Sequence, residues 1–245
     1  MNNVKSLFPD SKYVEMPYAF ERDEHLKVDD GFTLKYGTGI DNIKVLENFM
    51  SEEECDKWIA FMDEYEVWDD RDHCYPLHMA KDFDKRPIMA NQYHRQMETL
   101  GTKMVDAAAN VWNDKLNKHN YCMLVVNQIG SYHKPHTDIL DIHYENNNPY
   151  GDKGPSTEEQ HKIFKNMWSG HLSILVYLND DYGRGELYFP QHDYWIKPKK
   201  GSLVTFPGSL YYVHGVTAVE DKIRYVASQW AKFDYLDSEY KPINT

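Results

Sequence analysis

Residues 171–189 read HLSILVYLNDDYGRGELYF, in which two apolar runs are separated by a turn rich in Asn, Asp and Gly. Short runs rich in β-branched and aromatic residues, bounded by turn residues, predict β-strands at 171–178 and 186–189. Six further runs of this kind occur at 122–128, 132–138, 194–197, 202–206, 211–216 and 224–232. Eight short strands separated by turns predict a β-barrel or a jelly roll.

Two helices are predicted before these strands. Residues 40–49 suggest a short strand, after which Ser51 is a suitable N-cap and Glu54 completes a capping box. Apolar residues at helical spacing continue this first helix to about residue 65. We therefore expect an α+β fold that is mainly β, a jelly roll with the N-terminal helices packed on one sheet.

The second helix is expected from about residue 92 to residue 117. Its apolar stripe comprises Met97, Leu100, Met104, Ala108, Val111 and Trp112. The charged stretch 67–86, which contains Pro76, is expected to be a loop, and Pro87 follows it directly.

The 245 residues suit one domain, because no linker divides them. We expect an N-terminal arm at 1–39, a helical support at 40–120, a jelly-roll core at 121–232 and a C-terminal tail at 233–245. The polar, turn-rich stretch 144–168 interrupts the core, and loops of this length are usually functional lids or disordered segments.

Composition narrows the classes of partner and location. The formal net charge of −12 disfavours nucleic acid, because phosphates would be repelled. Three cysteines without C-x-x-C spacing argue against a disulfide framework or a structural zinc site and favour a reducing cytoplasm. No apolar stretch follows Met1 and no run of 18 apolar residues occurs, so we expect neither a signal peptide nor a membrane partner.

One pair of residues has the chemistry of a metal site. His136-Thr137-Asp138 places an imidazole and a carboxylate two positions apart, which on a strand is one face. A pair of this kind is expected about once by chance in this composition, and its alternative role is a surface strand end. His214, after a β-like run, could be the third ligand or a hydrogen-bonded structural residue. Two histidines and one carboxylate suit non-haem Fe(II) and O₂ chemistry.

Arg224 stands ten residues beyond His214, between apolar neighbours. If this strand is buried, a carboxylate must pair with the guanidinium, because an unpaired buried charge is costly. Arginine binds carboxylates through two parallel hydrogen bonds. The partner is either a ligand or an acidic side chain of the protein.

These residues resemble the motif of the Fe(II)/2-oxoglutarate-dependent oxygenases, and in particular the prolyl 4-hydroxylase-like family. The resemblance extends over about residues 40–232 and includes more than the metal ligands. Its segments are Gly130-x-x-x-x-Pro135-His136-x-Asp138, Ser173-Ile-Leu-Val-Tyr-Leu-Asn179, Gly185-Glu-Leu-Tyr-Phe-Pro190, residues 198–203, His214-Gly-Val216 through Gln229-Trp230, and residues 48–55.

The resemblance implies a double-stranded β-helix with Fe(II) held by His136, Asp138 and His214 at one barrel mouth. It implies that 2-oxoglutarate binds there as co-substrate, with Arg224 on its distal carboxylate and Tyr177 and Ser173 lining its pocket. The family often has a tyrosine at the position of Asn127, whose amide could donate instead. Ascorbate is a further candidate cofactor, and Trp230 stands where an aromatic residue borders the site.

The reaction implied is an O₂-dependent hydroxylation of a C–H bond, and the first candidate substrate is a prolyl residue of a peptide or protein. A free amino acid or another small metabolite is the alternative within the enzyme class. A non-catalytic jelly roll that binds a sugar or protein is the alternative outside it. We further expect the 144–168 loop to close over the substrate, with Tyr144, Tyr150 and Trp168 as contacts; the competing interpretation is a solvated insertion without a role.

Overall fold

The computed structural model describes residues 35–65, 74–76, 87–118, 122–136, 138, 171–208 and 210–234. Three sequence predictions lie outside these residues: the N-terminal arm up to residue 34, the 144–168 loop with Tyr144, Tyr150 and Trp168, and the tail beyond residue 234. The described residues contain no helix long and apolar enough to cross a membrane.

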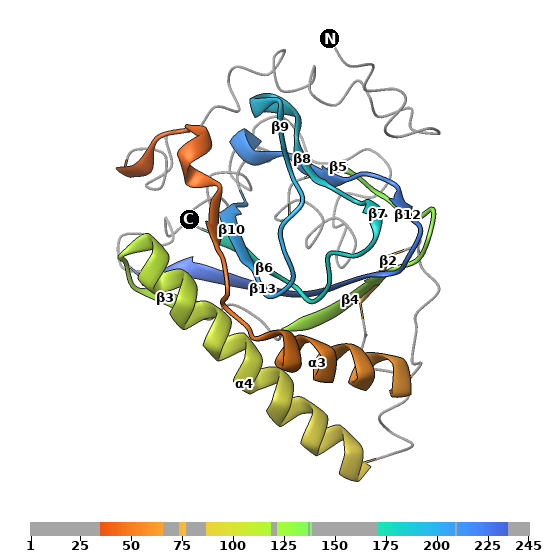
Figure 1. Cartoon of the computed structure of the whole chain (residues 1–245). Coiled ribbons are helices and arrows are strands. Elements are labelled where there is room, and N and C mark those ends of the chain that lie inside the picture. Colours follow the sequence, from red (N-terminus) through yellow and green to blue (C-terminus); the bar gives the residue numbers. More distant parts are fainter. Residues whose placement is uncertain are drawn as a thin grey trace, which may run out of the picture.

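The larger of two facing sheets has seven antiparallel strands in the described part of the chain (Figure 1). Its neighbours run in the order β1-β10-β6-β13-β4-β2, and β3 pairs with the far end of β13. The strands are β1 (Lys44–Leu46), β2 (Cys74–Pro76), β3 (Leu116–Lys118), β4 (Met123–Asn127), β6 (His171–Tyr177), β10 (Leu203–Pro207) and β13 (Arg224–Phe233).

The smaller sheet has the strand order β5-β11-β8-β9 and faces the larger one (Figure 1). Its members are β5 (His133–His136), β8 (Leu187–Phe189), β9 (Tyr194–Ile196) and β11 (His214–Val216), and β7 (Gly183–Arg184) pairs with β12 (Val219–Glu220) beside it. Three short 3₁₀ helices lie at η4 (Ile40–Asn42), η7 (Pro190–His192) and η8 (Leu210–Tyr212). The predicted mainly β jelly roll is confirmed, and the two sheets do not close into one barrel within the described residues.

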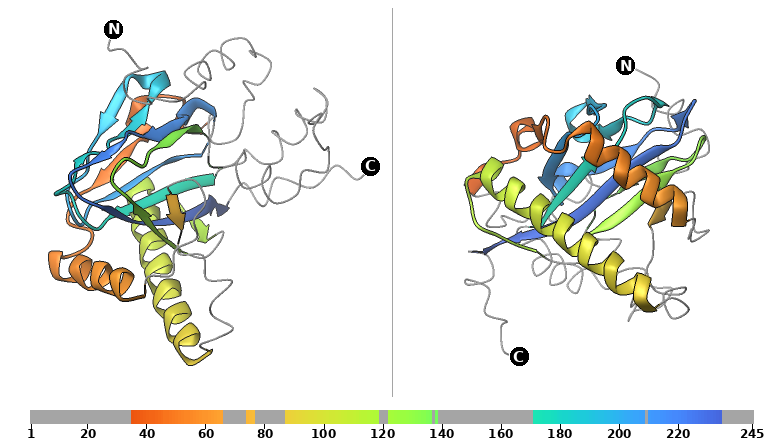
Figure 2. Two further views of the ribbon diagram at one scale, coloured as in Figure 1. Left: turned by 90° about the vertical axis from the view of Figure 1, so that its right-hand side faces the viewer. Right: turned by 60° about the horizontal axis from the view of Figure 1, so that its bottom comes forward.

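Two helices cover the outer face of the larger sheet, as predicted: α3 (Glu52–Tyr65) and α4 (Pro87–Trp112) (Figures 1 and 2). The capping box at the start of α3 is present, because the Glu54 backbone N–H donates to Ser51 Oγ at 3.2 Å and the Ser51 N–H donates to Glu54 Oε2 at 3.1 Å. Met97, Leu100, Met104, Ala108 and Trp112 are buried, so the predicted stripe of α4 faces the sheet.

The sequence-based boundaries of α4 were wrong at both ends. The helix begins at Pro87 rather than near residue 92, because proline lacks only a backbone N–H that would have no helical partner in the first turn. It ends at Trp112 rather than at residue 117, because Asn113 adopts the left-handed conformation with φ of 50° that terminates helices. Residues 116–118 then form β3.

The predicted loop at 67–86 and the predicted strand at 211–216 also require correction. Cys74–Pro76 form β2, which pairs with β4 as an edge strand, a position where proline is tolerated. The 3₁₀ helix η8 occupies 210–212, so β11 begins only at His214. Helical support and jelly roll are therefore not separate along the chain, because β1, β2 and β3 all join the larger sheet.

Along the central strands of the larger sheet, successive side chains point to alternate sides. One side faces the helices, and the other faces the smaller sheet. Thr205 lies on the helix-facing side, where its Oγ1 accepts a hydrogen bond from Trp112 Nε1 at 3.2 Å. The next residue, Phe206, lies on the opposite side, and its ring is 4.9 Å from that of Phe189 in the smaller sheet. Ser173 is the register partner of both Phe206 and Trp230, so all three are on the side between the sheets.

Candidate active site

The smaller sheet brings two of the predicted metal ligands together. His214 and His136 are direct register partners in β11 and β5. Asp138 follows β5 by two residues, and its Oδ1 lies 3.5 Å from His214 Nε2. The side chain of His136 lies outside the described part, so its contribution rests on the backbone pairing alone.

A hydrogen bond at Nδ1 orients the imidazole ring of His214. Its Nδ1 lies 3.1 Å from the backbone carbonyl of Tyr212, which can only accept, so Nδ1 carries the proton. In the neutral imidazole Nε2 then carries the lone pair on the side of Asp138, which is the form that a metal ligand requires. The imidazole is 5% exposed and packs against Phe206, with ring centroids 4.6 Å apart.

Asp138 is oriented from the larger sheet. The Ser173 hydroxyl in β6 donates a hydrogen bond to Asp138 Oδ2, which leaves Oδ1 on the side of His214. An imidazole nitrogen and a carboxylate oxygen at this separation form a donor set that suits Fe(II). The described residues thus fit a metal ion of the predicted kind at this position.

A second polar cluster lies at the opposite end of the larger sheet's inner side, where Arg224 begins β13. The guanidinium is 2% exposed. Its Nη1 donates to Asn127 Oδ1, and its Nη2 donates to the Tyr177 hydroxyl at 3.1 Å, with the ring of Tyr177 4.9 Å away. Asn127 Nδ2 lies 3.1 Å from His133 Nε2.

The charge of Arg224 has no anionic partner within the described residues. Its Nε is buried without a hydrogen-bond partner there, as is the hydroxyl of Tyr182. Burial works against the charged form, but Tyr177 and Tyr182 raise the pKa of Arg224 above its ordinary value. Burial also raises the pKa of Tyr177, and the guanidinium opposes that rise. A buried cation with an unsatisfied N–H fits the carboxylate of a bound ligand.

The remaining sequence-predicted site residues divide between these two clusters. Tyr177 and Asn127 contact Arg224, whereas the hydroxyl of Ser173 contacts Asp138. Trp230 is the register partner of Ser173 and therefore lies on the same side of the sheet. Tyr144 and Tyr150 lie outside the described residues.

Two neighbours of Arg224 were missed by sequence analysis. Tyr182 follows β6 in the turn to β7, and Asn179 is the last residue of the segment Ser173–Asn179. The apolar periodicity that reveals strands carries no information about turn residues. The signal available was that Asn179 ends one motif of the resemblance and that Tyr182 stands three residues before Gly185, which begins the next.

Comparison with known proteins identifies the domain. The model of the 2OG-Fe(II) oxygenase superfamily matches residues 119–232, which include both clusters. The match covers just under half of the chain and identifies residues 119–232 as a 2OG-Fe(II) oxygenase domain, the catalytic domain of an Fe(II)- and 2-oxoglutarate-dependent dioxygenase. The comparison with curated proteins finds no match.

Solved structures of the same superfamily resemble the fold at low sequence identity. An oxidoreductase of the 2OG-Fe(II) oxygenase family from Burkholderia pseudomallei is 10% identical, with a TM-score of 0.50 over 82% of this chain and 86% of that chain. A viral collagen prolyl hydroxylase from Paramecium bursaria Chlorella virus-1 is 19% identical, with a TM-score of 0.46 over 80% and 99%. A prolyl hydroxylase from Trichoplax adhaerens, in complex with a peptide of hypoxia inducible factor, is 15% identical, with a TM-score of 0.48 over 91% and 96%.

Proposed function

We propose that this dioxygenase hydroxylates a prolyl residue of a peptide or protein. In this proposal His136, Asp138 and His214 hold Fe(II), and Arg224 with Tyr177 and Asn127 holds the distal carboxylate of 2-oxoglutarate. The observation that carries the co-substrate assignment is the buried guanidinium of Arg224, which has no carboxylate partner among the described residues and an unpaired Nε.

The chain's own residues bind, orient and exclude water. Iron and 2-oxoglutarate, when bound with O₂, supply the oxidising chemistry that inserts oxygen into a C–H bond as 2-oxoglutarate becomes succinate and CO₂. Tyr212 keeps the proton of His214 on Nδ1, and Ser173 fixes the direction of Asp138. Phe189 and Phe206 pack near His214 and keep water away from this side of the ring.

The prolyl substrate is supported by the prolyl 4-hydroxylase-like motifs, above all His136-x-Asp138, Gly185-Glu-Leu-Tyr-Phe-Pro190 and the distal pair of His214 and Arg224. Trp230 is a suitable contact for a prolyl ring, because it shares the inner side with Ser173, which bonds Asp138. A free amino acid or small metabolite is the alternative substrate, and ascorbate is the reductant to test first. A cytoplasmic location, proposed from the sparse cysteines, is consistent with Cys55 and Cys122 being free thiols.

The test is a turnover assay on a peptide array in which proline positions vary, with Fe(II), 2-oxoglutarate and O₂, with and without ascorbate. Mass spectrometry should detect the addition of one oxygen atom to proline-containing peptides, together with succinate. The His214→Ala variant is the control for adventitious oxidation. Oxidation of free amino acids but of no peptide would replace the prolyl substrate by the small-molecule alternative, and absence of both 2-oxoglutarate binding and succinate formation would favour a non-catalytic jelly roll.

A further inference from the structure

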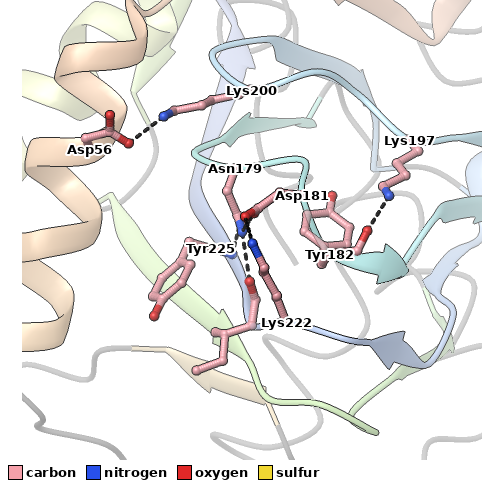
Figure 3. Close-up of polar contacts among 9 residues, drawn as sticks. Asp56, Asn179, Asp181, Tyr182, Lys197, Lys200, Lys222 and Tyr225 are labelled. Carbon is pink, nitrogen blue, oxygen red and sulfur yellow. Dashed lines mark hydrogen bonds and ion pairs between the residues drawn. The ribbon is translucent and has the colours of Figure 1, made fainter.

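The side chain of Asn179 bonds the backbone on both sides of Arg224. Its Nδ2 donates to the carbonyl of Ile223 at 2.8 Å, and its Oδ1 accepts from the N–H of Tyr225 at 2.9 Å (Figure 3). One amide thus holds the residue before and the residue after the buried arginine. Asn179 is itself only 9% exposed, so water competes little for these bonds.

This contact replaces sheet pairing that the backbone does not provide. On one edge, β4 pairs with the start of β13, with Asn127 opposite Arg224. On the other edge, β6 pairs with β13 only from Val226 onward, opposite Tyr177, because β6 ends there. Beyond that pair the Leu178 N–H still donates to the Tyr225 carbonyl at 3.0 Å. Asn179 then supplies the last bonds, so Arg224 is fixed from both sides.

A second contact fixes the amide of Asn179 itself. Its Nδ2 also donates to Asp181 Oδ1 at 2.9 Å, and the other oxygen of Asp181 pairs with Lys222 Nζ at 2.6 Å (Figure 3). Hydrogen bonds from Lys222 and Asn179 lower the pKa of Asp181, so this carboxylate stays ionised and accepting. The amide can therefore be oriented in one way, with nitrogen toward Asp181 and Ile223 and oxygen toward Tyr225.

We propose that Asn179 is a positioning residue for co-substrate binding, which sets the backbone of Arg224 so that its guanidinium meets the distal carboxylate of 2-oxoglutarate. Asn179 acts only through Arg224. The inference rests on the proposed role of Arg224 and adds to it the group that holds this arginine in place.

The test is a double-mutant cycle that combines Asn179→Ala with Arg224→Ala. The quantity measured is the Kd of each of two 2-oxo acids for the Mn(II)-loaded protein in the absence of O₂. Asn179→Ala should weaken 2-oxoglutarate binding about 10-fold, because two bonds that fix Arg224 are lost. Binding of 2-oxobutyrate, which lacks the distal carboxylate, should not change. In the Arg224→Ala background the Asn179→Ala change should have no further effect on 2-oxoglutarate.

Asn117→Ala is the matched control, because Asn117 Nδ2 donates to Asp234 Oδ1 at 2.8 Å near the far end of β13. It should leave both affinities unchanged. Asp181→Ala is a milder second variant, because it removes the carboxylate that orients the Asn179 side-chain amide but keeps the amide itself. It should weaken the binding of 2-oxoglutarate and leave that of 2-oxobutyrate unchanged. If Asn179→Ala weakened the binding of both acids equally, or if the two substitutions had additive effects, the positioning role of Asn179 would be overturned, while the co-substrate site would stand. An Arg224→Ala variant with normal 2-oxoglutarate affinity would overturn the co-substrate site itself.

Discussion

His214 and His136 are direct partners in the antiparallel pairing of β11 with β5, although 77 intervening residues separate them in the sequence. This register brings two imidazole-bearing residues to one place with Asp138 beside them, because Asp138 follows β5 by two positions. A single ion can therefore draw its ligands from two strands and the segment that follows one of them.

Replacing a metal ligand should remove iron without unfolding the protein. We expect His136→Ala, Asp138→Ala and His214→Ala each to lose tight iron binding, because each would remove one of the three proposed protein ligands, which water replaces poorly. Iron content and circular dichroism, measured on the same samples, check this prediction. His192→Ala is the control, because His192 instead contacts the Tyr211 carbonyl. Wild-type iron occupancy in a variant would remove that residue from the ligand set.

Replacing Arg224 should act on 2-oxoglutarate. Loss of a charge-assisted pair costs about 1.5–3 kcal/mol, so the KM for 2-oxoglutarate in Arg224→Ala should rise roughly 10- to 150-fold. Arg224→Lys should be milder, because the charge remains while the paired N–H groups toward Asn127 and Tyr177 are lost. Steady-state kinetics with varied 2-oxoglutarate measures both, and an unchanged KM in the alanine variant would contradict the assignment.

The hydroxyl of Ser173 should contribute to metal affinity through Asp138. Ser173→Ala leaves one carboxylate oxygen without its donor, and losses of partners to metal ligands typically weaken metal binding about 10- to 100-fold. Titration with Mn(II) or Fe(II) under argon measures the effect. Ser131→Ala is a control of equal burial, since this hydroxyl donates to the Gln128 carbonyl instead. Equal metal affinity in the two variants would contradict the prediction.

Two glycines with left-handed backbones should differ sharply in their tolerance of alanine. At Gly201, with φ of 78°, a Cβ would lie 2.2 Å from the Met50 carbonyl oxygen, so the backbone itself must move. At Gly130, with φ of 84°, a Cβ meets no atom of the described residues within 4 Å. Gly130→Ala should cost about 1–2 kcal/mol for conformation alone, and Gly201→Ala clearly more. Denaturant unfolding gives both values, and equal losses would exclude a close approach at Gly201.

The capping box of α3 gives a pH-dependent contribution to stability. The Ser51 backbone N–H, with Lys103, holds the pKa of Glu54 below its ordinary value of 4.5. A pKa that is lower in the folded than in the unfolded state stabilises the folded protein at pH values above the unfolded-state pKa. This contribution is lost as the pH falls through the folded-state pKa. The stability difference between wild type and Glu54→Gln should therefore shrink on acidification. It should stay below about 1 kcal/mol, because the carboxylate is half exposed. A stability difference between wild type and Glu54→Gln that does not change with pH would contradict the prediction.

The strands of the jelly roll could be predicted because each carries its own apolar pattern, whereas short edge pieces could not. Residues 171–178 contain three aliphatic residues in succession, Ile174-Leu175-Val176, followed by Tyr177 and Leu178, a pattern typical of a buried strand. By contrast Cys74–Pro76 and Leu116–Lys118 are strands because a neighbour offers an edge, a long-range effect that no local pattern contains. Pro87 was interpreted as a break in the loop before the second helix, although proline also occupies the first turn of helices, and local sequence does not distinguish the two roles.

The motifs named His136, Asp138, His214, Arg224 and their neighbours Tyr177, Ser173 and Asn127 as site residues, but the sequence did not predict the contacts among them. Sequence spacing indicates that His214 and Arg224 belong together, yet it does not reveal that they lie on different sheets. Nor does it reveal that Ser173 is bonded to Asp138, or that Asn179 holds the backbone around Arg224. Such contacts depend on turns and on register across the two sheets, for which a single sequence has no periodic signal.

His214 and Arg224 lie on facing sheets, and this placement has a mechanical consequence. His214 belongs to the smaller sheet and Arg224 to the larger one, so a molecule held at both ends spans the gap between two layers. If 2-oxoglutarate binds as proposed, the length of its five-carbon chain has to match the distance between the two sheets. Phe189 packs against Phe206 across the two sheets, so a change in the size of either ring would alter the spacing that the proposed co-substrate has to match, without touching its carboxylates.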